Sequence, residues 1–280
     1  MPYDTAYAAF CATHPTRRAL IAGHCWHYID AGAGAPPLVM LPGGFGEAAT
    51  SWRYILALAP LRRVIALHYP PGIATIAGLC DGLALLLDRL GVARAHLLGG
   101  SASGFVAQAF ARRHPARVAS LILAQSGAPR PARATLSRAL AAIVARLPIA
   151  AAFAALRLAS AWFLRGSAPE RRFWRSHFDM VVAAQTREAL VSRFLLAADF
   201  DGGYRLHPAD PDAWHGPVAI LESASDGLVG AGERAALRAL YPQARVYTLS
   251  GGHHDSVFHP EAQIAQIACI LAAHATAEAS

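Results

Sequence analysis

Short apolar runs alternate with segments of helical periodicity along most of the chain. Apolar runs of strand length lie at residues 38–41, 63–67, 95–98 and 118–123. Segments with helical spacing lie between them, at residues 51–58, 75–90 and 103–113. Strands that are apolar along their whole length are buried on both faces. The alternation therefore predicts an α/β fold, in which a mostly parallel central sheet is flanked by helices.

This alternation stops at about residue 127 and resumes after residue 212. The interval is rich in alanine and arginine, has helical composition, and is interrupted by prolines. Beyond this interval the hydrophobic pattern predicts strands at 217–221 and 245–249 and helices at 231–241 and 261–274. We therefore expect a core of residues 1–126 and 213–280. A helical lid, residues 127–212, would be inserted after the sixth core strand, over the carboxyl edge of the sheet.

Composition excludes several classes of protein. Hydrophobic residues make up 55% of the 280 residues and charged residues 15%, which excludes a disordered chain. The net charge is +7, and all 25 basic residues are arginine because the chain has no lysine. The absence of lysine excludes lysine Schiff-base chemistry and a P-loop lysine. The arginines form no recognisable nucleic-acid-binding motif and do not alternate with aromatic residues. We expect no nucleic-acid partner and no cofactor.

Cysteine spacing and hydropathy bear on the cellular location. The four cysteines show no CxxC spacing, so we expect reduced, mostly buried thiols in a cytoplasmic protein. The N-terminus lacks the pattern of a signal peptide. The longest apolar run, residues 147–156, is far shorter than the ~20 residues that span a bilayer. The sequence predicts no membrane span and leaves the oligomeric state open.

The segment Leu97–Gly104 carries the strongest chemical signal. A predicted strand leads into the glycine-flanked Ser101 and directly out into a helix. This is the pattern of a nucleophile elbow, in which a sharp turn exposes a reactive hydroxyl at the edge of the sheet. Ser103 stands where this motif usually has a glycine. If Ser103 were the nucleophile, Phe105 would occupy a position that needs a small residue, so Ser101 is the predicted nucleophile.

A serine hydroxyl needs a base to remove its proton. Among the thirteen histidines, His253 follows the last predicted strand and a pair of glycines, which directs it to the same sheet edge as Ser101. Its neighbour His254 is the alternative. His24 and His27 lie beside Cys25, yet on a short strand they supply an incomplete set of ligands, so we expect no metal site.

An acidic residue should orient the histidine. Asp226 lies just beyond the strand 217–221, and the chain order Ser101, Asp226, His253 is that of an α/β-hydrolase. Glu222 is the less favoured acid because it still belongs to the strand. An Asp-Gly pair also forms ordinary turns, so the catalytic role of Asp226 depends on its position between the other two residues.

Acyl transfer also needs hydrogen-bond donors for a developing oxyanion. The backbone N–H of Ala102, directly after the nucleophile, is one expected donor. The other would come from the glycine-rich loop that follows the first core strand, where Gly44 is the expected donor and Phe45 is second.

These segments resemble the α/β-hydrolase superfamily from about Trp26 to the C-terminus, and within it the maspardin branch. The resemblance rests on Leu38-Val-Met-Leu-Pro-Gly-Gly, Arg63-Val-Ile-Ala-Leu-His-Tyr-Pro, Cys80-Asp-Gly and Ala95-His-Leu-Leu-Gly-Gly-Ser-Ala-Ser-Gly-Phe-Val-Ala-Gln. Pro42, where many hydrolases have histidine, fits that branch. Animal maspardins lack the catalytic histidine and are regarded mainly as partner-binding proteins. This sequence differs by having His253 in that place.

Two functions follow from these residues. The first is a serine hydrolase that cleaves an ester or thioester of a small hydrophobic acyl substrate through Ser101, His253 and Asp226. The second is a maspardin-like binding protein without activity on the same scaffold. Lactone opening and C–C bond hydrolysis remain open. In the lid, Phe153, Trp162 and Phe163 are candidates for lining the substrate pocket, and we expect most of the other apolar lid residues to pack on the core. One or two of the lid arginines between residues 130 and 175, at the mouth of the pocket, would attract a remote carboxylate or phosphate.

Overall fold

A single eight-stranded sheet organises the chain. The computed structural model describes residues 3–44, 46–164 and 167–278, without the side chains of residues 49, 160–163 and 275–278. The strand order is β1-β2-β4-β3-β5-β6-β7-β8. The strands are β1 (Arg17–Ile21), β2 (His24–Ala31), β3 (Leu38–Leu41), β4 (Val64–His68), β5 (Ala95–Gly100), β6 (Val118–Ala124), β7 (Val218–Ser223) and β8 (Arg245–Leu249).

The sheet is parallel from β4 to β8. Only the pairs β1–β2 and β2–β4 are antiparallel. The strands at its centre, β3, β5 and β6, are buried along nearly their whole length, because helices cover both faces. This architecture confirms the predicted mostly parallel sheet flanked by helices.

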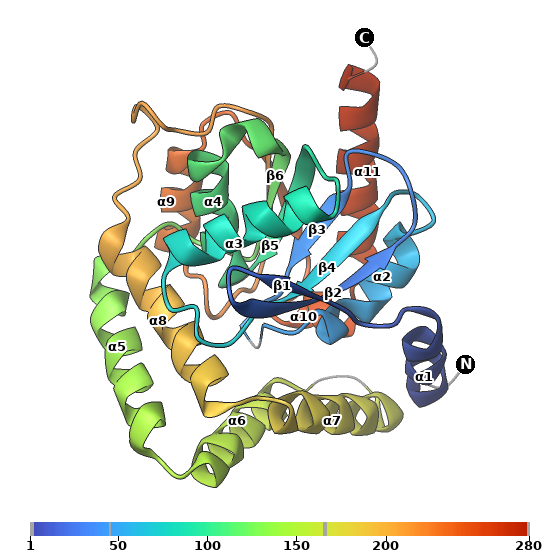
Figure 1. Cartoon of the computed structure of the whole chain (residues 1–280), viewed down its shortest axis with the longest axis vertical. Coiled ribbons are helices and arrows are strands. Elements are labelled where there is room, and N and C mark those ends of the chain that lie inside the picture. Colours follow the sequence, from blue (N-terminus) through green and yellow to red (C-terminus); the bar gives the residue numbers. More distant parts are fainter. Residues whose placement is uncertain (1–2, 45, 165–166, 279–280) are drawn as a thin grey trace.

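Two layers of helices enclose the sheet (Figure 1). One buried cluster joins the sheet to α3 (Ile76–Arg89), α4 (Ser103–Arg113) and α9 (Ala231–Leu240). A second cluster on the opposite face joins it to α1 (Tyr3–Thr13), α2 (Trp52–Leu58), α10 (Asp255–Phe258) and α11 (Glu261–Glu278). Of these helices, α1 and α10 were not anticipated from the sequence.

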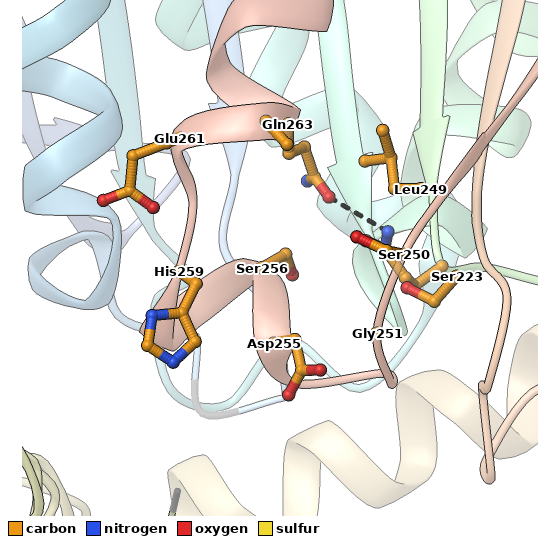
Figure 2. Close-up of a pocket in the computed structure, with 11 residues that line it drawn as sticks. Ser223, Leu249, Ser250, Gly251, Asp255, Ser256, His259, Glu261 and Gln263 are labelled. Carbon is orange, nitrogen blue, oxygen red and sulfur yellow. Dashed lines mark hydrogen bonds between the residues drawn. The ribbon is translucent and has the colours of Figure 1, made fainter. Parts of the chain in front are cut away.

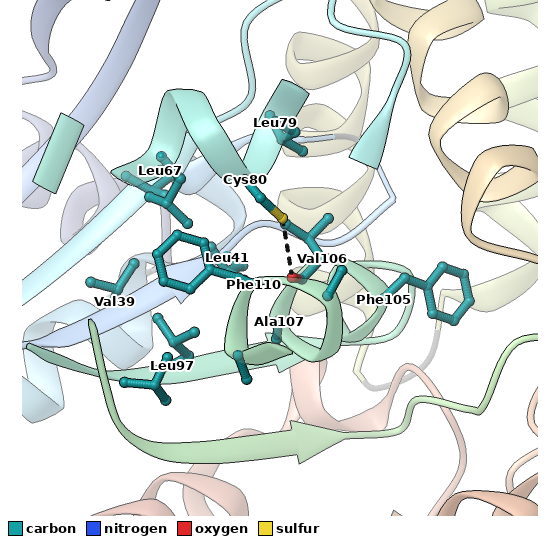
Figure 3. Close-up of a cluster of buried hydrophobic side chains, with 14 of the residues drawn as sticks. Val39, Leu41, Leu67, Leu79, Cys80, Leu97, Phe105, Val106, Ala107 and Phe110 are labelled. Atoms are coloured by element: carbon teal, nitrogen blue, oxygen red, sulfur yellow. Dashed lines mark hydrogen bonds between the residues drawn. The ribbon is translucent and has the colours of Figure 1, made fainter. Parts of the chain in front are cut away.

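Helix α4 passes through the centre of the first cluster. Its Phe110 is fully buried and lies among Val39, Leu67 and Leu97 of three neighbouring strands (Figure 3). Cys80 of α3 donates a hydrogen bond to the carbonyl of Val106 over 3.8 Å. Tight packing on α4 fixes the helix whose N-terminus follows Ser101.

In the described part of the chain, four helices lie between β6 and β7: α5 (Pro131–Arg146), α6 (Ile149–Phe163), α7 (Ala168–Ala183) and α8 (Arg187–Gly203). In Figure 1, α5 and α8 run side by side, and α6 and α7 lie below the sheet, near α10. They fall within the range expected for the lid. That they act as a lid over a substrate stays a prediction.

The helical insertion is tied to the core by buried polar contacts. Asp201 of α8 is fully buried and accepts hydrogen bonds from Arg133 Nε (2.6 Å), from Arg133 Nη2 (2.8 Å) and from the backbone N–H of Arg130 (2.9 Å). Arg133 also reaches Glu233 of α9 at 2.9 Å. A hydrogen-bonded carboxylate of this kind fixes the direction in which α5 leaves the core.

Much of the apolar surface of α5 and α6 is open to solvent. Leu136 is 59% exposed and Leu158 is 76% exposed, and Ile143 and Leu147 are also exposed. The expectation that most lid hydrophobic residues pack on the core is therefore wrong for these four. For Leu136 and Ile143 the physical reason is that α5 packs through small residues, Ala134, Ser137 and Ala141, which turns its larger side chains outward. Among the described residues, no helix combines the length and apolar character needed to cross a bilayer.

Three of the four cysteines lie at the surface. Cys11, Cys25 and Cys269 are exposed, and Cys80 alone is buried. The expectation of mostly buried thiols is wrong, because the three exposed residues lie on α1, on β2 near the sheet edge and on α11, where one face of each element meets solvent.

His177 of α7 is buried among aromatic rings, and neither ring nitrogen has a hydrogen-bond partner in the described part of the chain. Its ring lies 4.8 Å from that of Tyr7 on α1 and 5.5 Å from that of Trp174. Burial lowers the pKa of His177 to about 4. Protonation therefore opposes the docking of α7 on the core.

We expect the substitution His177→Phe to raise the free energy of unfolding and to flatten its dependence on pH. The pKa of His177 is lower in the folded protein than its unfolded value near 6.5. The contribution of the neutral His177 side chain to the free energy of unfolding is therefore complete above pH 6.5 and is lost as the pH falls toward 4. Urea unfolding at several pH values measures this slope, which is at most about 1.4 kcal/mol per pH unit for one proton. His96 and His254, whose pKa values are also lowered by burial, leave a residual slope in the variant. An unchanged profile would contradict this account of α7.

Candidate active site

Ser101 occupies a sharp turn between β5 and α4. Its φ of +53° is in the left-handed region, which a residue with a β-carbon rarely adopts. The turn is held by two hydrogen bonds: Ser101 N–H donates to the carbonyl of Ala124 at 2.8 Å, and Gly104 N–H donates to the carbonyl of Ser101 at 3.0 Å. The surrounding fold thus holds a strained serine at the carboxyl end of a central strand.

Close packing explains the small residues around the turn. A β-carbon on Gly99 would lie 2.8 Å from the Cα of Gly104, and one on Gly104 would lie 2.1 Å from Ser126 Oγ. Such distances are far below van der Waals contact, so strand, turn and helix approach closely only because these positions are glycine. Ser126, at the end of β6, was not identified from the sequence.

We expect Gly104→Ala to lower the free energy of unfolding by about 1–3 kcal/mol, because the added methyl group overpacks the turn. The double substitution Gly104→Ala/Ser126→Gly removes the clashing side chain and should recover much of the loss. Chemical denaturation of the two variants measures both values. Equal stability of Gly104→Ala and the unsubstituted protein would show that the turn accommodates the added methyl group, which would contradict the close packing described here.

Ser103, where the motif usually has glycine, is buried and takes part in the packing of the elbow. Its hydroxyl lies 2.8 Å from the carbonyl oxygen of Gly100 and 3.0 Å from that of Leu41, and its single hydrogen can be donated to either of them. Leu41 ends β3, immediately before the glycine-rich loop. Ser103 therefore ties the start of this loop to the turn that holds Ser101.

His253 lies beside Ser101, with its Nε2 2.9 Å from Ser101 Oγ. It follows β8 through the glycine pair, and the φ of +96° at Gly251 turns the chain there. A β-carbon at Gly251 would lie 2.3 Å from Asp255 Oδ2. The side chain of Asp255 also accepts a hydrogen bond from Gly252 N–H at 2.8 Å, which fixes the loop just before His253.

Asp226 completes a line of three side chains. His253 Nδ1 lies 2.9 Å from Asp226 Oδ2 and 3.0 Å from Oδ1. Asp226 Oδ1 also accepts the backbone N–H groups of Leu228 (2.9 Å) and Val229 (2.8 Å). The side chains of Asp226 and His253 are only 1% and 6% exposed, which protects their hydrogen bond from competition by water.

The alternative residues lie elsewhere. Glu222 is buried and forms an ion pair with Arg238 of α9. His254 packs its ring perpendicular to that of His253, with 4.9 Å between centroids, and burial together with the neighbouring His253 lowers its pKa to about 4. No group of three or more metal-binding side chains is present in the described ranges of the chain. The structure thus brings together Ser101, Asp226 and His253.

The glycine-rich loop lies next to the elbow. Leu41 of β3 is paired in register with Gly99 of β5, so the two chains leave the sheet side by side. β-carbons added at Gly43 and Gly44 would meet no atom within 4 Å, so the backbone there faces open space. Ala102 occupies the N-cap of α4, where backbone N–H groups lack partners within the helix. Phe45 lies outside the described residues.

A cavity of about 310 Å³ lies behind the loop that precedes His253. Figure 2 shows its lining by Ser250 and Gly251 of this loop and by Asp255, His259 and Gln263 from α10 and α11 and the segment between them. None of the three aligned side chains lines it. Of the lid candidates for substrate binding, Phe153 is half-buried on α6, and the side chains of Trp162 and Phe163 lie outside the described residues.

A parallel sheet whose strand ends carry serine, aspartate and histidine in that chain order is the arrangement of the α/β-hydrolases. The sequence profile of the alpha/beta hydrolase fold family matches residues 36–260, and the protein belongs to this family.

Similar proteins include both enzymes and maspardins. Maspardin from Homo sapiens is 39% identical over 128 residues, which cover 43% of this chain and 41% of maspardin. A 2-hydroxy-6-oxononadienedioate/2-hydroxy-6-oxononatrienedioate hydrolase from Burkholderia vietnamiensis is 38% identical over 121 residues, 38% of this chain and 42% of the enzyme. The chain therefore matches about two fifths of the length of these relatives. A hydrolase from Pseudomonas aeruginosa has the same fold, with a TM-score of 0.77, 24% identity and coverage of 92% of this chain and 98% of that chain.

Proposed function

We propose that the protein is a serine hydrolase that cleaves an ester or thioester of a small hydrophobic acyl substrate. The observation that carries this proposal is the unbroken line from Ser101 Oγ through His253 to Asp226, with 2.9 Å at each step. Such a line supplies a nucleophile, a base and a group that orients the base.

In the proposed reaction, Ser101 attacks the acyl carbonyl carbon while His253 Nε2 accepts the hydroxyl proton. Asp226 accepts the hydrogen bond from Nδ1–H and stabilises the imidazolium that forms. Backbone N–H groups of Gly44 and Ala102 would stabilise the negative charge on the carbonyl oxygen. The imidazolium then protonates the leaving alcohol or thiol, and an acyl-enzyme remains on Ser101. Water, deprotonated by His253, then attacks the acyl-enzyme, and the imidazolium returns the proton to Ser101 Oγ as the acid leaves.

The alternative is a maspardin-like protein that binds a partner and has no activity. The likeness to maspardin over 128 residues favours it. The buried pair of His253 and Asp226 favours the enzyme, because a binding protein has no need to align a buried imidazole between a carboxylate and a strained serine.

Turnover of p-nitrophenyl esters distinguishes these two functions. With a hydrolase that forms an acyl-enzyme, rapid mixing with p-nitrophenyl acetate should release a burst of p-nitrophenol of up to one equivalent per enzyme, followed by steady turnover wherever deacylation is slower. No release above the rate of the His253→Ala variant would support the binding protein.

A further inference from the structure

Arg193 of α8 has a buried guanidinium group, and two of its nitrogen atoms have no hydrogen-bond partner among the described residues. Its Nη2 donates to the carbonyl of Tyr69 at 2.6 Å. Its Nε and Nη1 are shielded from solvent, and the described part of the chain provides them with no hydrogen bond. Burial lowers the pKa of Arg193, yet guanidinium keeps its charge at any physiological pH. A buried charge with two unused donors is costly unless something else occupies them.

The guanidinium lies against the glycine-rich loop. A β-carbon on Gly46 would lie 2.5 Å from Arg193 Nε and 2.9 Å from its Cζ, so the group packs directly on the backbone of Gly46. The guanidinium also stacks on the ring of Tyr69, whose centroid lies 5.2 Å from Cζ. Gly46 N–H donates to the carbonyl of Gly43 at 2.8 Å, and Gly46 accepts from Tyr69 N–H at 3.0 Å. Arg193 is thus held in place by the loop that carries Gly44.

The nearest carboxylate is already engaged. Glu47 Oε2 lies 2.5 Å from His68 Nδ1, and its Oε1 accepts a hydrogen bond from Gln185 Nε2 at 3.0 Å. Glu47 raises the pKa of Arg193 through its charge, but it forms no ion pair with Arg193 within 4.0 Å in the described residues. Three further polar atoms of this cluster, His68 Nε2, Tyr69 Oη and Gln185 Oε1, are also buried without a partner among the described residues.

The position of Arg193 relates it to Ser101. Tyr69 directly follows β4, and Ser101 directly follows β5, and these two strands flank β3. Neighbouring strands lie about 4.8 Å apart, so the ends of β4 and β5 are separated by roughly 10 Å. A substrate acyl chain of a few carbon atoms bound at Ser101 spans a separation of this order.

We infer that Arg193 binds a carboxylate at the far end of the acyl chain, so that the substrate is an ester or thioester of a short dicarboxylic acid. The unused Nη1 offers a charge-assisted hydrogen bond to one oxygen of that carboxylate, while Nε–H points from the other edge of the planar guanidinium. This inference rests on the proposed hydrolase function. The arginines considered from the sequence lay between residues 130 and 175 and did not include Arg193, because only the packing on Gly46 distinguishes it from surface arginines.

The test compares the kcat/KM of two esters that differ in one group, mono-p-nitrophenyl glutarate and p-nitrophenyl valerate. The protein should prefer the glutarate ester, and Arg193→Gln should reduce that preference roughly 10- to 100-fold, the usual effect of losing a hydrogen-bonded charge. Arg193→Lys should recover part of it. Arg146→Gln, which removes an exposed lid arginine from the end of α5, is the matched control and should keep the preference.

Equal losses of kcat/KM for both esters in Arg193→Gln would mean that Arg193 only supports the Gly46 loop. Equal kcat/KM values for both esters in the unsubstituted protein would also contradict the carboxylate site. A binding measurement separates this inference from the proposed function. Calorimetric titration of the Ser101→Ala variant with glutarate should give heat of binding that is absent with glutaramide and absent in Ser101→Ala/Arg193→Gln. If neither ester is hydrolysed, the hydrolase proposal fails, and the titration still decides whether Arg193 holds a carboxylate.

Discussion

Replacing Ser101 with alanine should reduce the kcat of ester hydrolysis by at least about 10⁴-fold. The physical reason is that His253 then has no hydroxyl to deprotonate, and only the oxyanion donors and substrate binding remain. The β-carbon and the backbone at φ +53° are kept, so the strain of the turn is unchanged. Steady-state kinetics with p-nitrophenyl butyrate measures the loss.

Thermal unfolding of the same variant separates a chemical effect from a structural one. Because Ser101→Ala removes one partly exposed hydroxyl, we expect the Tm to stay within about 2 °C. Ser103→Ala is the matched comparison, since it removes a buried hydroxyl that contacts Leu41 and Gly100. It should lower the Tm while leaving a measurable kcat. Full activity of Ser101→Ala, or loss of activity only in Ser103→Ala, would show that Ser101 is not the nucleophile.

The second large effect is expected for Asp226→Asn, which should lower kcat by roughly 10³- to 10⁴-fold. Asp226 accepts hydrogen bonds from Leu228 N–H, Val229 N–H and His253 Nδ1. Asparagine has only one acceptor oxygen, so its amide group would face either a backbone N–H or the imidazole. The imidazole then adopts the wrong tautomer and its cation loses its stabilising charge.

Glu222→Gln provides the control for the acid. Glu222 is a buried carboxylate near the end of β7, the strand that precedes Asp226, but it pairs with Arg238 on α9. We expect its replacement to destabilise the fold while kcat per folded molecule stays within about tenfold, because it does not touch His253. A larger loss for Glu222→Gln than for Asp226→Asn, measured by ester kinetics, would reverse the two assignments.

Local sequence patterns predicted the strands β3 to β8 and the helices α2, α3, α4, α9 and α11, because these patterns record burial directly. The helix expected at residues 103–113 is α4 itself, and Thr75 caps α3 through its side chain, as the predicted start at residue 75 implies. The N-terminal helix α1 escaped this approach because only Phe10 is buried in it. The four residues of α10 are too few for a periodic signal.

The aligned serine, aspartate and histidine were accessible from the sequence because each follows a strand, and parallel strands end at one edge of the sheet. Arg193 and Ser126 were not accessible in this way. Arg193 stands out because it packs on Gly46, and Ser126 because it packs on Gly104. Arg193 is far from Gly46 in the sequence, and helix α4 and strand β6 separate Gly104 from Ser126. The outward-facing Leu136 and Ile143 of α5 were misjudged for a related reason, since helical spacing identifies an apolar face but not which face packs.

The most direct test of the central claim is covalent labelling with a fluorophosphonate, followed by mass spectrometry of the digested protein. Phosphonylation requires a serine activated by a neighbouring base. We predict one adduct, on the peptide that contains Ser101, lost in Ser101→Ala and strongly slowed in His253→Ala. An unlabelled protein, or an adduct on another serine that persists in Ser101→Ala, would contradict the assignment of Ser101 as the nucleophile of a hydrolase.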